Sequence, residues 1–146
     1  HSEELLIGKI RFRTFDLGGH ETARRIWKDY FATVDGIVFL VDAADRTRFL
    51  EAAEELRQLM ESQELSTVPI VVLGNKIDVR NAASEEEFRQ ALGLHSHTTF
   101  GREIKSTAAA HAAQESGIRP VEVFMCSVIK RMGYAEGFKW LAQFLE

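Results

Sequence analysis

The chain has 146 residues, of which 45% are hydrophobic and 27% are charged, and its formal net charge is −4. This length and composition suit one soluble domain with enough apolar residues for a core, so we treat residues 1–146 as a single domain. The acidic balance argues against nucleic acid as a partner, because nucleic-acid binding usually requires a basic patch.

Other features concern the cellular setting. The one cysteine, Cys126, excludes an internal disulfide and fits a reducing cytosol. No apolar stretch approaches the length of a membrane span, and no signal peptide is visible. Because the chain begins at His1 rather than at a methionine, we expect a segment upstream of it.

The first half of the chain alternates between strand and helix patterns. Residues 5–16 predict two strands that meet at Gly8 in a hairpin, and Ile26, Trp27, Tyr30 and Phe31 follow at helical spacing. Residues 37–42 predict an apolar strand of the kind buried on both faces of a parallel sheet. Asp45 is a candidate cap for the next helix, whose apolar positions run from 49 to 60.

The second half continues this alternation. Pro69 precedes a predicted strand over 70–74, and Ser84 with Glu87 predicts a capping box for a helix that ends at Gly93. Residues 95–118 indicate a long surface insertion with a helical part over 107–113. A strand over 121–126 and a closing helix over 138–145 complete the pattern, which predicts a three-layer α/β fold with a mostly parallel sheet.

Three groups of candidate site residues follow predicted strands, where ligands bind in parallel α/β sheets. Asn75, Lys76 and Asp78 form one group. The Asp78 carboxylate can accept hydrogen bonds from N1–H and the exocyclic amine of guanine, whereas adenine presents the opposite pattern. Asn75 can bond the base edge and brace the neighbouring loops, and the Lys76 stem can lie over the base plane. The alternative for this segment is an ordinary polar turn.

The second group, Asp16-Leu17-Gly18-Gly19-His20, suits a magnesium ion beside a γ-phosphate. Asp16 can hold Mg²⁺ through a water, and the Gly19 N–H can approach the phosphate. His20 then lies where a hydrolytic water must be oriented, the alternative being a solvent-exposed loop histidine. In the third group, Ser127 and Val128 can contact the base through backbone N–H groups.

Other candidate residues are assigned no chemistry. Cys126 is interpreted as a small core residue because no triad partners are evident. His95, His97 and His111 lack the spacing of a metal site and are interpreted as solvated. No Gly-x-x-x-x-Gly-Lys-Ser/Thr loop, which normally holds the phosphates, precedes the motifs in this sequence.

These motifs resemble the Sar-family small GTPases of the COPII vesicle coat. The resemblance lies in residues 14–20, 23–30, 36–45, 73–78 and 119–128. It implies a P-loop GTPase fold that lacks its first strand and phosphate loop, with the absent strand in the middle of the sheet. It also implies that GTP or GDP is the ligand, Mg²⁺ the cofactor, and recruitment of the coat for endoplasmic-reticulum to Golgi transport the function.

The resemblance further implies the partners. These are coat subunits that include a GTPase activator, a membrane-bound exchange factor, and the endoplasmic-reticulum membrane itself. The family contacts that membrane through an N-terminal helix that is absent here, so we expect a cytoplasmic protein peripheral to the membrane. The alternative is a GTPase-like binding module that does not hydrolyse nucleotide.

Overall fold

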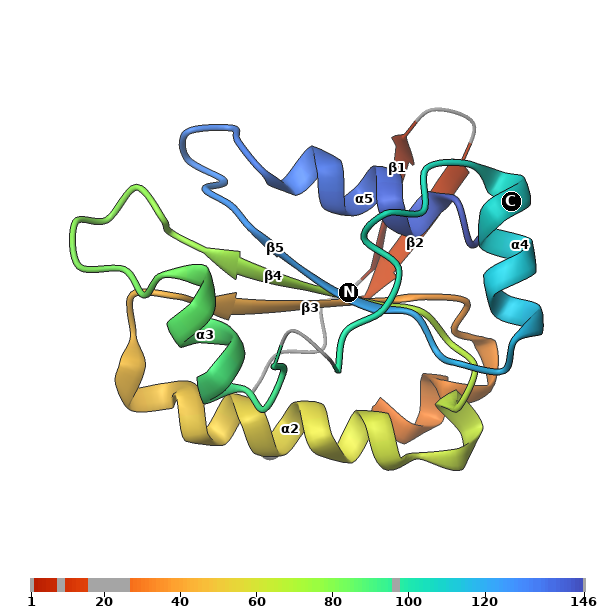
Figure 1. Ribbon diagram of the computed structural model, residues 1–146, viewed down its shortest axis with the longest axis horizontal. Helices are drawn as coiled ribbons and strands as arrows, with labels where there is room; N and C mark the ends of the chain where they lie inside the picture. Colours follow the sequence, from red (N-terminus) through yellow and green to blue (C-terminus); the bar gives the residue numbers. More distant parts are fainter. Residues whose placement is uncertain (1, 8–9, 16–26, 96–97, 146) are drawn as a thin grey trace.

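The computed structural model describes residues 2–7, 10–15, 27–95 and 98–145. It contains two sheets (Figure 1). Strands β1 (Ser2–Ile7) and β2 (Ile10–Phe15) pair as an antiparallel hairpin, as the sequence predicts. Strands β3 (Ile37–Asp42), β4 (Ile70–Asn75) and β5 (Val121–Met125) form a parallel sheet in the order β3-β4-β5. The β1–β2 pair is not hydrogen-bonded to this sheet.

Helices connect the parallel strands and cover both faces of the sheet. The α-helices are α2 (Phe49–Glu61), α3 (Glu85–Ala91), α4 (Thr107–Glu115) and α5 (Tyr134–Ala142). Short 3₁₀ helices are η1 (Trp27–Thr33), η2 (Arg46–Arg48) and η3 (Gln63–Leu65). Figure 1 shows α2 and α3 on one side of the sheet and α5 on the other, so the predicted three-layer α/β arrangement is confirmed.

The sheet separates two hydrophobic cores. On the α2 and α3 side, Val72 and Val123 pack with Phe88, and all three are fully buried. On the opposite side, Val71 packs with Trp140 of α5. Alternate residues of β4 therefore enter opposite cores, as the period of two in a strand requires. This two-sided burial holds the carboxyl end of β4 in place.

Strand β3 is less buried than β4, although both strands are apolar. Phe39 and Val41 are buried, but Val38 and Leu40 are 37% and 57% exposed. The prediction that residues 37–42 are buried on both faces is therefore wrong. Phe39 and Val41 belong to the core on the α2 and α3 side, so Val38 and Leu40 point to the opposite face, whose core contains residues of β4 and α5 but none of β3.

Of three local expectations about helix ends, two are confirmed and one is wrong. The Ser84 hydroxyl accepts a hydrogen bond from the Glu87 N–H at 3.2 Å, which confirms the predicted cap of α3. Gly93 follows α3 with φ of 74°, the left-handed conformation typical of a helix stop. The prediction for Asp45 is wrong, because the residue precedes η2 and makes no side-chain cap bond, while Arg48 occupies the position before α2.

Residues 98–118 pack and hydrogen-bond against α5 and β5, unlike the surface insertion that the sequence predicts. The predicted helix forms as α4, and its Ala110 is completely buried against the α5 side. The Trp140 indole N–H donates to the Gly101 carbonyl at 2.7 Å, and the Phe100 N–H donates to the Val121 carbonyl at 2.8 Å. The segment therefore closes the edge of the domain beside β5, which corrects the sequence-based expectation.

Candidate functional site

The loops that follow β4 and β5 lie beside each other at the carboxyl end of the sheet (Figure 1). The two strands are parallel, with Gly74 paired with Met125, so the loops start at the same level. Backbone hydrogen bonds continue past the strands, from Cys126 N–H to the Gly74 carbonyl at 2.8 Å and from Ile77 N–H to the Cys126 carbonyl at 3.1 Å. The structure thus brings together two of the three predicted groups.

Asn75 joins three loops. Its side-chain Oδ1 accepts a hydrogen bond from the Val128 N–H at 3.0 Å, and its backbone carbonyl accepts one from the Ala43 N–H at 2.8 Å. The residue is half-buried. Asn75 therefore holds the loops after β3, β4 and β5 together, and this matches the bracing role that the sequence suggests.

Asp78 is oriented by Ser127. The Ser127 hydroxyl donates to Asp78 Oδ1 at 2.7 Å, and the serine is completely buried. Within the part of the chain that the structure describes, no donor is bonded to Asp78 Oδ2, and the residue is exposed. A carboxylate has about four acceptor positions, so Asp78 retains capacity for a ligand with two donors.

The loop after β5 is a tight turn. Ser127 and Met132 exchange backbone hydrogen bonds of 2.9 and 3.1 Å, and the Lys130 N–H donates to the Ser127 hydroxyl at 3.1 Å. Gly133 follows with φ of 87°. Ser127 N–H and Val128 N–H thus have partners within the protein, contrary to the suggestion that they are available to a base. The sequence analysis missed the hydroxyl of Ser127 as the group that acts on Asp78.

Lys76 extends toward the end of β3. Its ammonium Nζ lies 2.9 Å from Asp42 Oδ2, and the backbone of Lys76 has a φ of 74°, which is uncommon outside glycine. The hydrogen bond and charge of Asp42 raise the pKa of Lys76. Burial alone would raise the pKa of Asp42, but hydrogen bonds from Lys76 and from the Ala44 N–H lower it. Both groups are therefore charged at neutral pH.

Asp16, Gly19 and His20 lie outside the described residues, so their predicted roles remain predictions. Within the described residues there is no group of three or more histidine, cysteine or acidic side chains that could hold a metal ion.

Cys126 and two of the three remaining histidines lie within the described residues. Cys126 is completely buried, and burial raises the pKa of its thiol, so it is a poor nucleophile at neutral pH. His95 and His111 are exposed, and His97 lies outside the described residues. Thus Cys126 is a core residue, and its sulfur lies 3.8 Å from Asn75 Oδ1.

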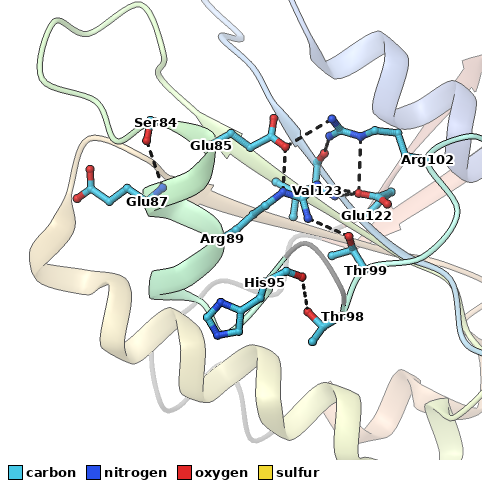
Figure 2. Close-up of polar contacts among 10 residues, drawn as sticks. All are labelled: Ser84, Glu85, Glu87, Arg89, His95, Thr98, Thr99, Arg102, Glu122 and Val123. Carbon is cyan, nitrogen blue, oxygen red and sulfur yellow. Dashed lines mark hydrogen bonds and ion pairs between the residues drawn. The ribbon is translucent and has the colours of Figure 1, made fainter.

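A charged cluster that the sequence analysis missed links α3 to β5. Figure 2 shows Arg89 and Arg102 converging on two glutamates. Arg89 bonds Glu122 and Glu85, each at 2.9 Å, and only 4% of the Glu122 side chain is exposed. Arg102 lies 3.7 Å from Glu122 and stacks 5.0 Å above the Phe124 ring. The cluster fixes the helix that follows the Asp78 loop against the strand that precedes Ser127.

Comparison with known proteins identifies relatives of this chain. The model of the ADP-ribosylation factor family matches residues 1–145. The chain is 47% identical over 144 residues to the small COPII coat GTPase SAR1 of Giardia intestinalis, and the alignment covers 99% of the chain and 71% of the relative. It is 40% identical over 149 residues to the small COPII coat GTPase SAR1 of Nicotiana tabacum, with coverage of 99% and 72%. The chain therefore belongs to the ADP-ribosylation factor family and, within it, to the Sar1-type small GTPases.

Proposed function

We propose that this chain forms the guanine-binding part of a GTP-hydrolysing switch. The observation that carries the proposal is the 2.7 Å hydrogen bond by which Ser127 holds the Asp78 carboxylate at the carboxyl end of the sheet. Asp78 would accept hydrogen bonds from N1–H and the exocyclic amine of guanine. Adenine would leave these acceptors unpaired, and a site built to hydrogen-bond its ligand rejects an analogue that lacks the matching donors.

The neighbouring residues would support this contact in distinct ways. Asn75 holds the Val128 backbone at 3.0 Å and so keeps the two base-binding loops in register. Ser127 and Val128 would act through Asp78 and Asn75 and would form one wall of the base site. The stem of Lys76 would cover the flat face of the base.

For the residues that take part in GTP hydrolysis, we propose roles from the sequence motif alone. Asp16 would hold Mg²⁺, which neutralises charge on the β- and γ-phosphates when it is bound. The Gly19 N–H would contact the γ-phosphate, and His20 would orient the attacking water. An orienting group of this kind acts on the transition state and contributes to kcat more than to binding.

The cellular role that we propose follows from the relatives, which are named as small COPII coat GTPases. The protein would recruit coat subunits to the endoplasmic-reticulum membrane when GTP is bound, with one subunit acting as GTPase activator and a membrane protein as exchange factor. Among the described residues, the helices are too short or too polar to span a bilayer. We propose peripheral attachment through an N-terminal amphipathic helix.

The direct test uses the full-length protein as its gene encodes it. Affinities for GDP, ADP and xanthosine diphosphate are measured by calorimetry, and GTP hydrolysis is followed in single turnover with and without purified coat complex. We expect a preference for GDP and faster hydrolysis with the coat. Equal affinity for ADP and GDP would contradict the base site. Tight GTP binding without hydrolysis under any condition would favour the alternative, a binding module.

A further inference from the structure

Asp42 was not among the residues that sequence motifs assign to the nucleotide, yet it contacts one of them. It is the last residue of β3 and is paired in the parallel register with Asn75, the last residue of β4. This register places Asp42 next to the start of the loop that carries Lys76 and Asp78. Side chains at adjacent strand ends of a parallel sheet face the same ligand-binding edge.

The contact between Asp42 and Lys76 is specific in its geometry. Asp42 Oδ2 accepts a hydrogen bond from Lys76 Nζ at 2.9 Å, while Asp42 Oδ1 accepts one from the Ala44 N–H, also at 2.9 Å. Each carboxylate oxygen thus has its own donor. The carboxylate is fixed to the backbone by one bond and can hold the ammonium with the other.

The pair differs from a stabilising core contact, because 48% of the Lys76 side chain and 37% of the Asp42 side chain are exposed. Exposed ion pairs contribute little to the stability of the fold. Lys76 also has a left-handed backbone, with φ of 74°, and such conformations concentrate at functional sites. An exposed pair built on an uncommon backbone conformation suits a role in ligand binding better than a role in folding.

We propose that Asp42 is a positioning residue for Lys76, and this inference rests on the proposed guanine site. Asp42 holds the ammonium at the end of β3, so that the four-carbon stem of Lys76 is ordered before the base arrives. A lysine stem has several rotatable bonds, and ordering one such side chain on binding reduces affinity by about three- to tenfold. Because Asp42 orders the stem beforehand, most of this reduction in affinity is avoided when the base binds.

The test is a double-mutant cycle in the full-length protein, with GDP as the probe. Asp42→Asn keeps an oxygen for the Ala44 N–H but removes the charge that holds Lys76. Lys76→Met keeps the apolar stem but removes the ammonium. We expect Asp42→Asn to weaken GDP binding by about three- to tenfold, mainly through faster dissociation. In the Lys76→Met background, the same Asp42→Asn change should alter the affinity less than twofold, because the positioning partner is gone.

The control is Glu87→Gln, which removes a different exposed ion pair, with Arg46, and should leave GDP affinity unchanged. Thermal unfolding in each variant reports a purely structural effect, which we expect to be absent for Asp42→Asn. The inference is overturned if the Asp42→Asn variant binds GDP as tightly as wild type does. It is also overturned if Asp42→Asn weakens GDP binding by the same factor in the wild-type and Lys76→Met backgrounds, or if the Asp42→Asn variant is unfolded.

One more variant separates this inference from the proposed function. Asp78→Asn should lose its preference for GDP over xanthosine diphosphate if the guanine site is correct. If Asp78→Asn behaves in this way and Asp42→Asn has no effect, only the role of Asp42 is wrong. If wild type itself shows no preference for GDP, the guanine site and the role of Asp42 are both wrong.

Discussion

The Ser127 hydroxyl donates a hydrogen bond to Asp78 Oδ1 at 2.7 Å and accepts one from the Lys130 N–H at 3.1 Å. The serine is completely buried, so its hydroxyl is fixed from both sides. This arrangement orients a carboxylate that is itself exposed. A preorganised acceptor of this kind loses little entropy on binding and therefore favours a ligand with matching donors.

Asp78→Asn is expected to reverse the base preference of the full-length protein. The amide replaces one acceptor by a donor, so GTP binding should weaken and xanthosine triphosphate should be preferred. Competition binding with both nucleotides measures the change. Asp35→Asn, an exposed aspartate in the turn before β3, serves as the control and should not alter the preference. Unchanged GTP affinity in Asp78→Asn would remove Asp78 from the site.

His20→Gly is expected to keep nucleotide binding and to lose hydrolysis stimulated by the coat subunit. The reason is that a group that orients water stabilises the transition state more than the bound substrate. Single-turnover hydrolysis with the activating subunit measures the effect. A rate within about threefold of wild type, a barrier change of under about 0.7 kcal/mol, would show that His20 has no such role.

Gly133→Ala is expected to destabilise the protein more than Gly117→Ala does. Both glycines are left-handed, with φ of 87° and 84°, so alanine costs about 1–2 kcal/mol at either position. At Gly133 the added Cβ would also overlap the Met125 carbonyl and approach Cys126 Cα to 2.8 Å, whereas at Gly117 it meets nothing within 4 Å.

The additional crowding at Gly133 should lower the free energy of unfolding by a further amount of about 1–3 kcal/mol. It should also weaken GDP binding, because Gly133 follows the turn that carries Ser127. Urea unfolding and calorimetry of the two variants provide the comparison. Equal stabilities for Gly133→Ala and Gly117→Ala would show that the turn adapts to a side chain.

Glu122→Gln is expected to lower the free energy of unfolding by about 3 kcal/mol, the lower end of the range for loss of one partner from a buried ion pair. The change leaves Arg89, only 11% exposed, without its buried counter-charge. Glu61→Gln, which breaks an exposed pair with Arg57, should have no measurable effect. Urea unfolding compares the two. Equal effects would mean that the cluster in Figure 2 contributes nothing beyond a surface pair.

Residues 1–146 expressed by themselves are expected to bind GTP more weakly than micromolar. The sequence contains no phosphate loop, and among the described strands β3 pairs only with β4, so its other edge has no partner among them. We expect any stable form of this segment to cover that edge, for example by strand exchange between two copies. Calorimetric titration measures the affinity for GTP, and light scattering measures the oligomeric state. Micromolar binding by a monomer would contradict this prediction.

The local sequence determined where the helices and strands form and to which family the chain belongs. The capping box at Ser84 and the glycine at 93 define α3 because their effects act within one or two helical turns. The pairing of β1 with β2 and the parallel strands follow from the pattern of apolar residues. The Asn75-Lys76-Ile77-Asp78 motif indicated a guanine site because both the residue types and their place after a strand were readable in the chain.

Only the tertiary structure determined which apolar strand is covered. Strands β3 and β4 have similar sequences, yet Leu40 is 57% exposed whereas Leu73, its partner in the register, is 3% exposed. Likewise, the bond from Lys76 to Asp42 joins residues 34 positions apart, and the bond from Arg89 to Glu122 joins residues 33 apart. Burial and long-range pairing depend on which elements become neighbours in space, and the local pattern of a single chain does not specify that.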